Sequence, residues 1–275
     1  MIAILHAIIL GIVEGLTEFL PISSTGHLIV AEHMIGYKDA AQTFTVVVQI
    51  GAIAAVAWYY RKDLWAKITG LFKNATGARK FWLNLVIATI PAGLAGLALD
   101  KTMEKYAKPS TVALALIAGG IILLAAEQRF KPVAHQDKLQ LENITPKQAL
   151  GVGAAQVVSL IPGVSRSGAT IVGGMFAGLN RLTAATFSFY LSLPILGLAS
   201  IYKLVKARHT IGDLPGGSTA LIFGTVAAFI SALLVVGWLL RYISRHNFKP
   251  FAYYRIAFGI LLLLLVATNL LANNA

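Results

Sequence analysis

The chain has 275 residues, of which 57% are hydrophobic and only 12% charged, about half the charged share of an ordinary soluble domain. Cysteine is absent, which excludes disulfides, thiolate metal sites and a cysteine nucleophile. The formal net charge of +12 suits a membrane protein, whose Lys and Arg residues gather in loops that meet anionic lipid, and we expect no nucleic-acid partner.

The first 36 residues predict a broken pair of helices. An apolar segment reaches Pro21, and a second segment begins near Ser23 and ends near Gly36. Neither piece can cross a hydrocarbon core of about 30 Å, which takes about 20 residues. We expect a helix–break–helix pair that enters and leaves on one side of the bilayer, where protein or a wet cavity satisfies its free backbone groups.

Spanning helices are predicted after this broken pair. A second broken segment, again followed by spanning helices, is predicted later in the chain. A polar linker at 131–147 precedes a second broken segment, interrupted at Pro162 and ending near Gly178. Six further runs lack Asp, Glu, Lys and Arg and are long enough to span a bilayer. These runs are 42–60, 81–99, 110–126, 182–202, 214–240 and 256–275.

The two halves of the chain resemble each other. An odd number of spans in each half would invert the second half relative to the first, so that the broken helices meet near the bilayer midplane. We therefore expect an all-α polytopic membrane protein with an inverted-topology repeat, made of ten helical pieces: six transmembrane helices plus two re-entrant helix hairpins. The first repeat is expected at 1–130 and the second at 148–275. Matched pairs at an offset of 142 residues include Gly11 and Gly153, Glu14 and Gln156, and Ser23 and Ser165.

Positive charge is distributed unevenly among the connecting segments. Thirteen Lys and Arg residues fall at 61–80, 129–147 and 241–249, and seven fall in the segments expected on the other side. The positive-inside rule places the first group in the cytoplasm and both termini outside. Arg255, which enters the last span near its basic end, is expected to snorkel toward the interface.

Two acidic residues interrupt the first apolar segment. Glu14 and Glu18 share a helix face at spacing i, i+4, and an ionised side chain at the centre of a span costs on the order of 3 kcal/mol. Such a pair persists where a cation, a positive side chain or a proton offsets its charge. The alternative is that both glutamates lie near an aqueous boundary at the end of the helix.

Arg166 is the expected counter-charge, because it lies in the second break, the repeat equivalent of the first. Its planar guanidinium offers bidentate donation to phosphate or carboxylate. An ion pair with Glu14 or Glu18 without a substrate role is the alternative.

Hydroxyl-bearing residues precede both short helices. Ser and Thr at such positions are N-caps or, where two helix N-termini converge, part of an anion site. Nearby glycines would let the backbone approach a phosphate closely. The hydroxyl residues are Ser23, Ser24, Thr25, Ser165 and Ser167, and the glycines are Gly26, Gly163 and Gly168.

His27 lies three residues after Ser24 and on the same helix face. A hydroxyl with an imidazole within reach is the arrangement of a nucleophile and its base, and nearby carboxylates would orient the imidazole or bind a divalent metal. A purely structural histidine is the alternative.

Two motifs carry a resemblance to a known family. The stretch 14–27, which reads EGLTEFLPISSTGH, and the stretch 162–170, which reads PGVSRSGAT, are similar to the signature motifs of the bacterial undecaprenyl-diphosphatases, the bacitracin-resistance family. The resemblance covers essentially the whole chain. It implies a phosphatase that converts undecaprenyl diphosphate to undecaprenyl phosphate for cell-wall synthesis, with Mg²⁺ or Ca²⁺, in the bacterial inner membrane. The site would face the periplasmic side.

The resemblance also implies residue roles. Glu14 and Glu18 would bind the metal or organise the site, and Arg166 would clamp the diphosphate. Ser24 would attack phosphorus or position a water, and His27 would act as base or orient a group. The other motif residues expected to bind substrate are Ser23, Thr25, Gly26, Ser165, Ser167, Gly168 and Thr170.

The implied partners are the prenyl diphosphate and membrane lipids, and bacitracin resistance would follow from competition for the same lipid. A homodimer stays open. The rival hypothesis is a lipid-phosphate transporter or flippase, because broken helices in inverted repeats are typical of secondary transporters. Transport needs no Ser24 and His27 pair, whereas paired carboxylates would serve proton coupling.

Overall fold

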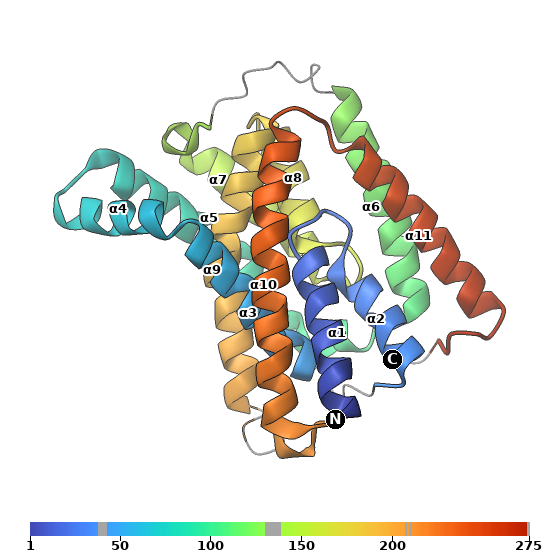
Figure 1. Ribbon diagram of the computed structural model, residues 1–275. Coiled ribbons are helices and arrows are strands. Elements are labelled where there is room, and N and C mark those ends of the chain that lie inside the picture. The colour runs from blue at the N-terminus through green and yellow to red at the C-terminus, as the bar shows by residue number, and fades with distance from the viewer. Residues whose placement is uncertain (38–42, 130–138, 207, 209–210, 274–275) are drawn as a thin grey trace.

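The computed structural model describes residues 1–37, 43–129, 139–206, 208 and 211–273, and all regular structure in these ranges is helical (Figure 1). The first half contains α1 (Ile2–Thr17), α2 (Ser24–Ile35), α3 (Thr43–Tyr59), α4 (Arg61–Phe72), α5 (Thr76–Glu104) and α6 (Pro109–Arg129). The second half contains α7 (Pro146–Val157), α8 (Arg166–Phe176), α9 (Arg181–Lys206), α10 (Gly217–Ile243) and α11 (Lys249–Ala267), with short 3₁₀ turns at Leu141–Asn143, Val158–Leu160 and Ile211–Asp213.

Five of these helices, α5, α6, α9, α10 and α11, are long and apolar enough to cross a membrane. A sixth span results if α3 and α4, which meet at an angle of 73°, are counted together. Large apolar side chains remain on the outside of these helices; Leu97 is 75% exposed and Leu234 is 69% exposed. A protein that keeps its longest apolar helices at its surface is a multi-pass membrane protein.

Both predicted breaks are present. Pro21 lies in the segment between α1 and α2, and Pro162 lies between the 3₁₀ turn Val158–Leu160 and α8. Proline ends a helix because it lacks the N–H and its ring clashes with the preceding turn. Each broken pair packs against itself, α1 on α2 and α7 on α8.

The two halves exchange partners in the core. The first helix of each half packs on a long helix of the other half, α1 on α10 and α7 on α5, and α3 also packs on α9. Glycines permit the close approach: a Cβ at Gly11 would lie 2.2 Å from the carbonyl oxygen of Gly224, and one at Gly153 would lie 2.5 Å from that of Ala88. The matched glycines of the predicted repeat therefore occupy matched helix contacts.

The segment after Tyr60, expected to be a loop, is instead the helix α4, so the described residues hold eleven α-helices rather than ten helical pieces. Its apolar residues lie at helical spacing, and Leu64 packs against the core while Trp65 and Phe72 are 68% and 85% exposed. Abundant lysines obscured this periodicity in the sequence. α4 lies at the end of the molecule opposite to both termini (Figure 1).

The expected linker at 131–147 is only partly described, because 130–138 lie outside the described residues. The remainder is packed rather than free. Leu141 and Ile144 are buried, and the Asn84 side-chain amide donates to the carbonyl oxygen of Ile144 at 2.7 Å.

Candidate active site

The two broken segments meet in the middle of the molecule. The Ser167 hydroxyl, in the first turn of α8, donates to the carbonyl oxygen of Leu20 in the first break, with an Oγ–O distance of 2.9 Å. This contact joins residues that are 147 positions apart in sequence. The motifs at 14–27 and 162–170 therefore form one site, as the predicted convergence of the breaks requires.

A buried ion pair lies at the centre of this site. Arg166 Nη2 is 3.0 Å from Glu18 Oε1, and the two side chains are only 8% and 6% exposed. The predicted counter-charge is thus in place, and its partner is Glu18. A charge-assisted bond in a buried setting fixes both groups in one geometry.

Arg166 has further contacts and one free donor. Its Nη1 donates to the carbonyl oxygen of Ser188 at 2.9 Å and lies 3.3 Å from the Ser188 hydroxyl, on α9. Its buried Nε has no hydrogen-bond partner among the described residues. The guanidinium is therefore held from two sides, while its Nε–H group is unpaired among the described residues.

Ser24 directs its hydroxyl to Glu18. The Oγ donates to Oε2 at 2.8 Å, so the two oxygens of one carboxylate receive Arg166 and Ser24. A hydroxyl that donates to a carboxylate is arranged as a nucleophile beside its base.

His27 faces away from this pair. Its Nδ1 is 2.8 Å from the carbonyl oxygen of Ser23, and its Nε2 is 2.7 Å from the Tyr254 hydroxyl. Nδ1 donates to the carbonyl, which leaves Nε2 to accept from Tyr254 in the neutral ring. The imidazole stacks on Phe258 with centroids 4.4 Å apart. Both ring nitrogens are thus engaged outside Ser24, and the side-by-side placement expected from their spacing is not found.

Glu14 lies one turn before Glu18 and is 1% exposed. Neither of its carboxylate oxygens has a hydrogen-bond partner among the described residues, and Gln49 and Ser24 are among its polar neighbours. Because a buried polar group without a partner is costly, these oxygens suit a ligand. They fit a divalent cation that takes its remaining ligands from a phosphate, as Mg²⁺ commonly does. The described residues hold no group of three or more His, Cys, Asp or Glu that could hold a metal without such help.

Ser23 and Ser165 hold matching backbone conformations before α2 and α8. Their φ angles are 68° and 65°, on the side that residues with a Cβ rarely adopt. Ser165 caps α8, since its Oγ accepts from the Gly168 N–H at 3.1 Å, whereas the Ser23 side chain makes no cap on α2. The Ser165 hydroxyl also contacts that of Ser167 at 3.0 Å.

The remaining predicted residues surround this centre less closely. Thr170 is fully buried, and its hydroxyl lies 2.6 Å from that of Ser188. Thr25 is half-buried. A Cβ at Gly26 would meet apolar side chains at 3.1–3.4 Å, and one at Gly168 would lie 2.8 Å from Arg255 Nη1, so both glycines make room for neighbouring side chains.

Three side chains of the site were missed in the sequence. Ser188 lies in a run of apolar residues and carried no charge to mark it. Tyr254, on α11, had no sequence signal that linked it to the motifs, and its neighbour Arg255 was expected at the bilayer interface. Arg255 is instead 1% exposed and reaches both breaks, so the expected snorkelling is wrong: the helix begins at Lys249, which places Arg255 in its second turn against α6.

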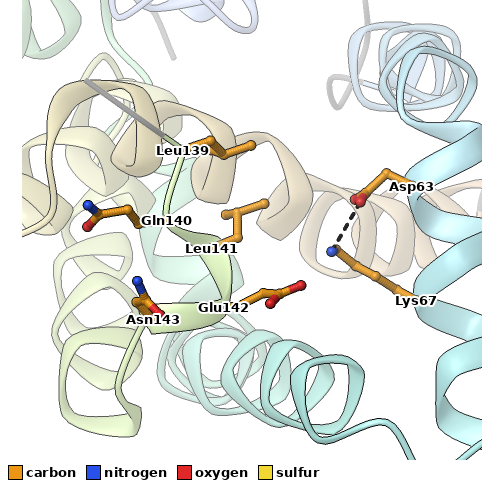
Figure 2. A pocket seen from close by; sticks show the side chains of 7 residues that line it. All are labelled: Asp63, Lys67, Leu139, Gln140, Leu141, Glu142 and Asn143. Carbon is orange, nitrogen blue, oxygen red and sulfur yellow. Dashed lines mark ion pairs between the residues drawn. The ribbon is translucent and has the colours of Figure 1, made fainter. Parts of the chain in front are cut away.

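Two cavities lie in different parts of the molecule. One of about 280 Å³ lies between α4 and the segment before α7, where the Asp63 and Lys67 ion pair faces 139–143, and none of its lining residues belongs to the site (Figure 2). The other, of about 230 Å³, borders the second break. Its lining is mostly apolar and includes Val164, Gly168 and Phe176. An apolar cavity that ends beside a polar site suits a ligand with a lipid tail.

Comparison with known proteins places the chain among proteins of one family. The family model described as bacitracin resistance protein BacA matches residues 7–261. Undecaprenyl-diphosphatase 1 of Paraburkholderia xenovorans is 50% identical over 262 residues, which cover 94% of this chain and 93% of that protein. Undecaprenyl-diphosphatase of Nitrosospira multiformis is 49% identical over 263 residues, covering 95% and 94%, and that of Nitrosomonas europaea is 48% identical over 271 residues, covering 97% and 96%.

Proposed function

The chain belongs to the bacitracin resistance protein BacA family, and we propose that it is a membrane phosphatase that hydrolyses undecaprenyl diphosphate to undecaprenyl phosphate and inorganic phosphate. This reaction would return the lipid carrier to cell-wall synthesis. The single observation that carries the proposal is the buried set of Glu18, Arg166 and Ser24, contributed by both broken segments. A charge-neutralising fork beside an activated hydroxyl is what transfer of a phosphoryl group requires.

Ser24 and Glu18 supply the chemistry in this proposal. The Ser24 oxygen attacks the terminal phosphorus while its proton moves to Glu18, and the bond from that phosphorus to the bridging oxygen breaks, releasing undecaprenyl phosphate. Water then hydrolyses the phosphoserine and releases inorganic phosphate. The alternative within the same site is that Ser24 positions a water that attacks directly. The 2.8 Å contact supports Glu18, rather than His27, as the base in either case.

Arg166 would bind the terminal phosphate. Its free Nε and the planar fork suit two phosphate oxygens, and charge that develops on them is stabilised where water is excluded. The N–H groups at the uncapped start of α2 near Ser23 would donate further hydrogen bonds. Ser165 and Ser167 would join them if substrate replaces the contacts that their hydroxyls make with each other and with Leu20. His27, held by Tyr254, would orient the first turn of α2 rather than take a proton from Ser24.

A divalent cation, Mg²⁺ or Ca²⁺, belongs to this proposal. Glu14 would hold it with its two unpartnered oxygens, and Glu18 would contribute where substrate binding releases Arg166. When bound, such an ion polarises phosphoryl oxygens and screens the charge of the diphosphate.

The finer architecture is proposed on the same basis. The exchanged packing of α1 on α10 and α7 on α5, with matching φ angles at Ser23 and Ser165, supports an inverted repeat with two re-entrant hairpins and halves at 1–130 and 148–275. The charge distribution supports a site that opens to the periplasmic side of the inner membrane. Bacitracin resistance would then follow from competition between the enzyme and the antibiotic for the same lipid.

Phosphate release tests the proposal. Purified protein in detergent, given a prenyl diphosphate and Mg²⁺, should release inorganic phosphate, and the Glu18→Gln variant should release far less at equal folded concentration. If the wild-type protein releases none but moves the intact lipid across reconstituted vesicles, the transporter hypothesis replaces the enzyme.

A further inference from the structure

A second buried arginine lies beside the site without an acidic partner among the described residues. The Arg255 guanidinium is within hydrogen-bond distance of four backbone carbonyl oxygens: Pro21 at 3.3 Å, Ala115 at 3.5 Å, Gly163 at 3.4 Å and Val164 at 3.0 Å. Pro21 belongs to the first break, and Gly163 and Val164 belong to the second. One side chain from α11 therefore contacts both breaks at once.

Two glycines leave the space that the Arg255 guanidinium occupies. A Cβ at Gly119, on α6, would lie 2.2 Å from Nη2, and a Cβ at Gly168, on α8, would lie 2.8 Å from Nη1. Any larger residue at Gly119 would displace the guanidinium, because that Cβ would also lie 2.7 Å from Cζ. The two glycines leave a slot through which the arginine reaches the breaks.

The hydrogen bonds from Arg255 satisfy carbonyl groups that the breaks leave without helical donors. Carbonyl groups in a broken helix lack their helical donors, and in a water-poor interior each unsatisfied group is costly. A charged guanidinium with several donors in a planar fork satisfies carbonyls from different segments. The burial of the charge is in turn compensated by these carbonyl dipoles.

We propose that Arg255 is a positioning residue that holds the two breaks in register for the phosphatase reaction, an inference that rests on the proposed function. Pro21 is three residues before Ser24, and Val164 is two residues before Arg166. Arg255 therefore sets the distance between the nucleophile segment and the phosphate-binding segment. A misplacement of about 1 Å can cost on the order of 10²-fold in rate.

Two variants test the proposal, because either alone could fail to fold. Arg255→Lys keeps the charge but cannot reach carbonyls of both breaks, and Gly119→Ala keeps the arginine but displaces its fork. Both should lower kcat, by on the order of 10²-fold for Arg255→Lys and less for Gly119→Ala, with little change in KM. Two controls should leave kcat unchanged: Arg181→Lys, at another buried arginine, and Gly197→Ala, where a Cβ meets no atom within 4 Å.

A distance measurement supplies a readout besides activity. The chain has no cysteine, so spin labels at Met34→Cys, on α2, and Ile161→Cys, in the second break, report the relative placement of the two segments. The distance distribution should shift or broaden in Arg255→Lys and Gly119→Ala and stay unchanged in Arg181→Lys.

Unchanged distributions in both variants would overturn the inference, as would wild-type kcat per folded molecule accompanied only by lower thermal stability. If the wild-type protein releases no phosphate but the distributions still shift, the proposed function is wrong while the coupling of the breaks stands.

Discussion

Ser23 and Ser165 share a backbone conformation with positive φ, but their side chains make different contacts. Each residue holds a positive φ, at a cost on the order of 1–3 kcal/mol, and such strain persists only where the surroundings impose it. Ser165 uses its hydroxyl to cap α8, whereas Ser23 leaves the start of α2 uncapped. The two matched positions therefore differ in their contacts: the Ser165 side chain satisfies an N–H group at the start of its helix, and the Ser23 side chain does not.

Ser24 should be separable from the other hydroxyls by mutation. If it is the nucleophile, Ser24→Ala should lower kcat by more than 10³-fold, since deletion of a nucleophile costs more than loss of one phosphate donor. Ser165→Ala and Ser167→Ala should each cost about 10²–10³-fold or less. Steady-state phosphate release at equal folded concentration measures the ratios. Similar losses at all three serines would indicate that water is the nucleophile.

Arg166→Lys should remain badly impaired although the charge is kept. A lysine lacks the planar fork that binds Glu18 and Ser188 in this structure and would bind phosphate in the proposed complex, so kcat/KM should fall on the order of 10²-fold or more. Arg181→Lys is the matched control, because Arg181 binds the buried Glu127 through a similar fork, with Nη2 2.6 Å from Oε2. The control should lose stability and keep its turnover. Near wild-type kcat/KM in Arg166→Lys would leave Arg166 with a structural ion pair only.

Glu14→Gln should weaken the response to metal. Removal of the only buried carboxylate with unpartnered oxygens among the described residues should raise the Mg²⁺ concentration for half-maximal activity about tenfold or more. Metal titrations after treatment with EDTA measure this shift. Glu127→Gln, at a buried carboxylate engaged by Arg181, should leave the midpoint unchanged. Full activity of the wild-type protein in excess EDTA would contradict the metal assignment.

The parts of the site that the sequence predicts are those marked by charge. Glu18 and Arg166 stand out because each interrupts an apolar segment, and burial forces such charges together. The partner of His27 could not be predicted, because Tyr254 lies 227 positions away and reaches it only through the packing of α11 beside α2. Arg255 was misjudged for the same reason: its surroundings are set by distant segments rather than by neighbours in sequence.

At the scale of elements, long apolar runs predict the spans, and Pro21 and Pro162 predict the breaks. Proline alone does not decide this, because Pro91 and Pro194 lie inside the continuous helices α5 and α9. α4 escaped prediction because its lysines interrupt the apolar run that the preceding helix begins. Its exposed Trp65 and Phe72, with flanking basic residues, are typical of a helix that lies at a membrane interface. Helix boundaries were also displaced at α11, which begins at Lys249 rather than at 256.

The close contact between α1 and α10 can be tested by substitution of its glycine. Gly11→Ala would place a methyl group 2.2 Å from the carbonyl oxygen of Gly224, so α1 and α10 must separate, and the free energy of unfolding should fall by about 1–3 kcal/mol. Gly197→Ala, in open space on α9, should instead raise it by about 1 kcal/mol, because alanine favours the helix. Unfolding in mixed detergent micelles measures both. Equal effects of the two substitutions would argue against the α1–α10 contact.

The whole molecule is built from two halves that cannot form the site alone. α1 finds its partner in α10 and α7 in α5, so each broken segment is held by a long helix of the other half. The ion pair between Glu18 and Arg166 crosses the same boundary, as do the contacts of Arg255 with Pro21 and Ala115. Such long-range pairing is what the predicted internal repeat implies, but its side-chain detail depends on the packed structure.

The orientation of the two halves across the membrane can be measured by labelling of single cysteines. Asn74 lies in the connection from α4 to α5 and His246 in that from α10 to α11, and these connections are at the end of the molecule opposite to both termini (Figure 1). Tyr106 lies in the connection from α5 to α6 and Gly212 in that from α9 to α10, at the end that carries both termini, and all four residues are exposed. Because basic residues gather in the segments at the α4 end, that end should face the cytoplasm. The chain contains no cysteine, so single cysteines introduced at these positions can be labelled without background.

In intact spheroplasts, a membrane-impermeant maleimide should label Tyr106→Cys and Gly212→Cys at once. Asn74→Cys and His246→Cys should react only after the membrane is permeabilised. Each half contributes one position to each side, so the four results together test the inverted arrangement as well as the sidedness of the site. Labelling of Asn74→Cys and Tyr106→Cys from the same side would exclude α5 as a span, and the reverse pattern at all four positions would turn the site toward the cytoplasm.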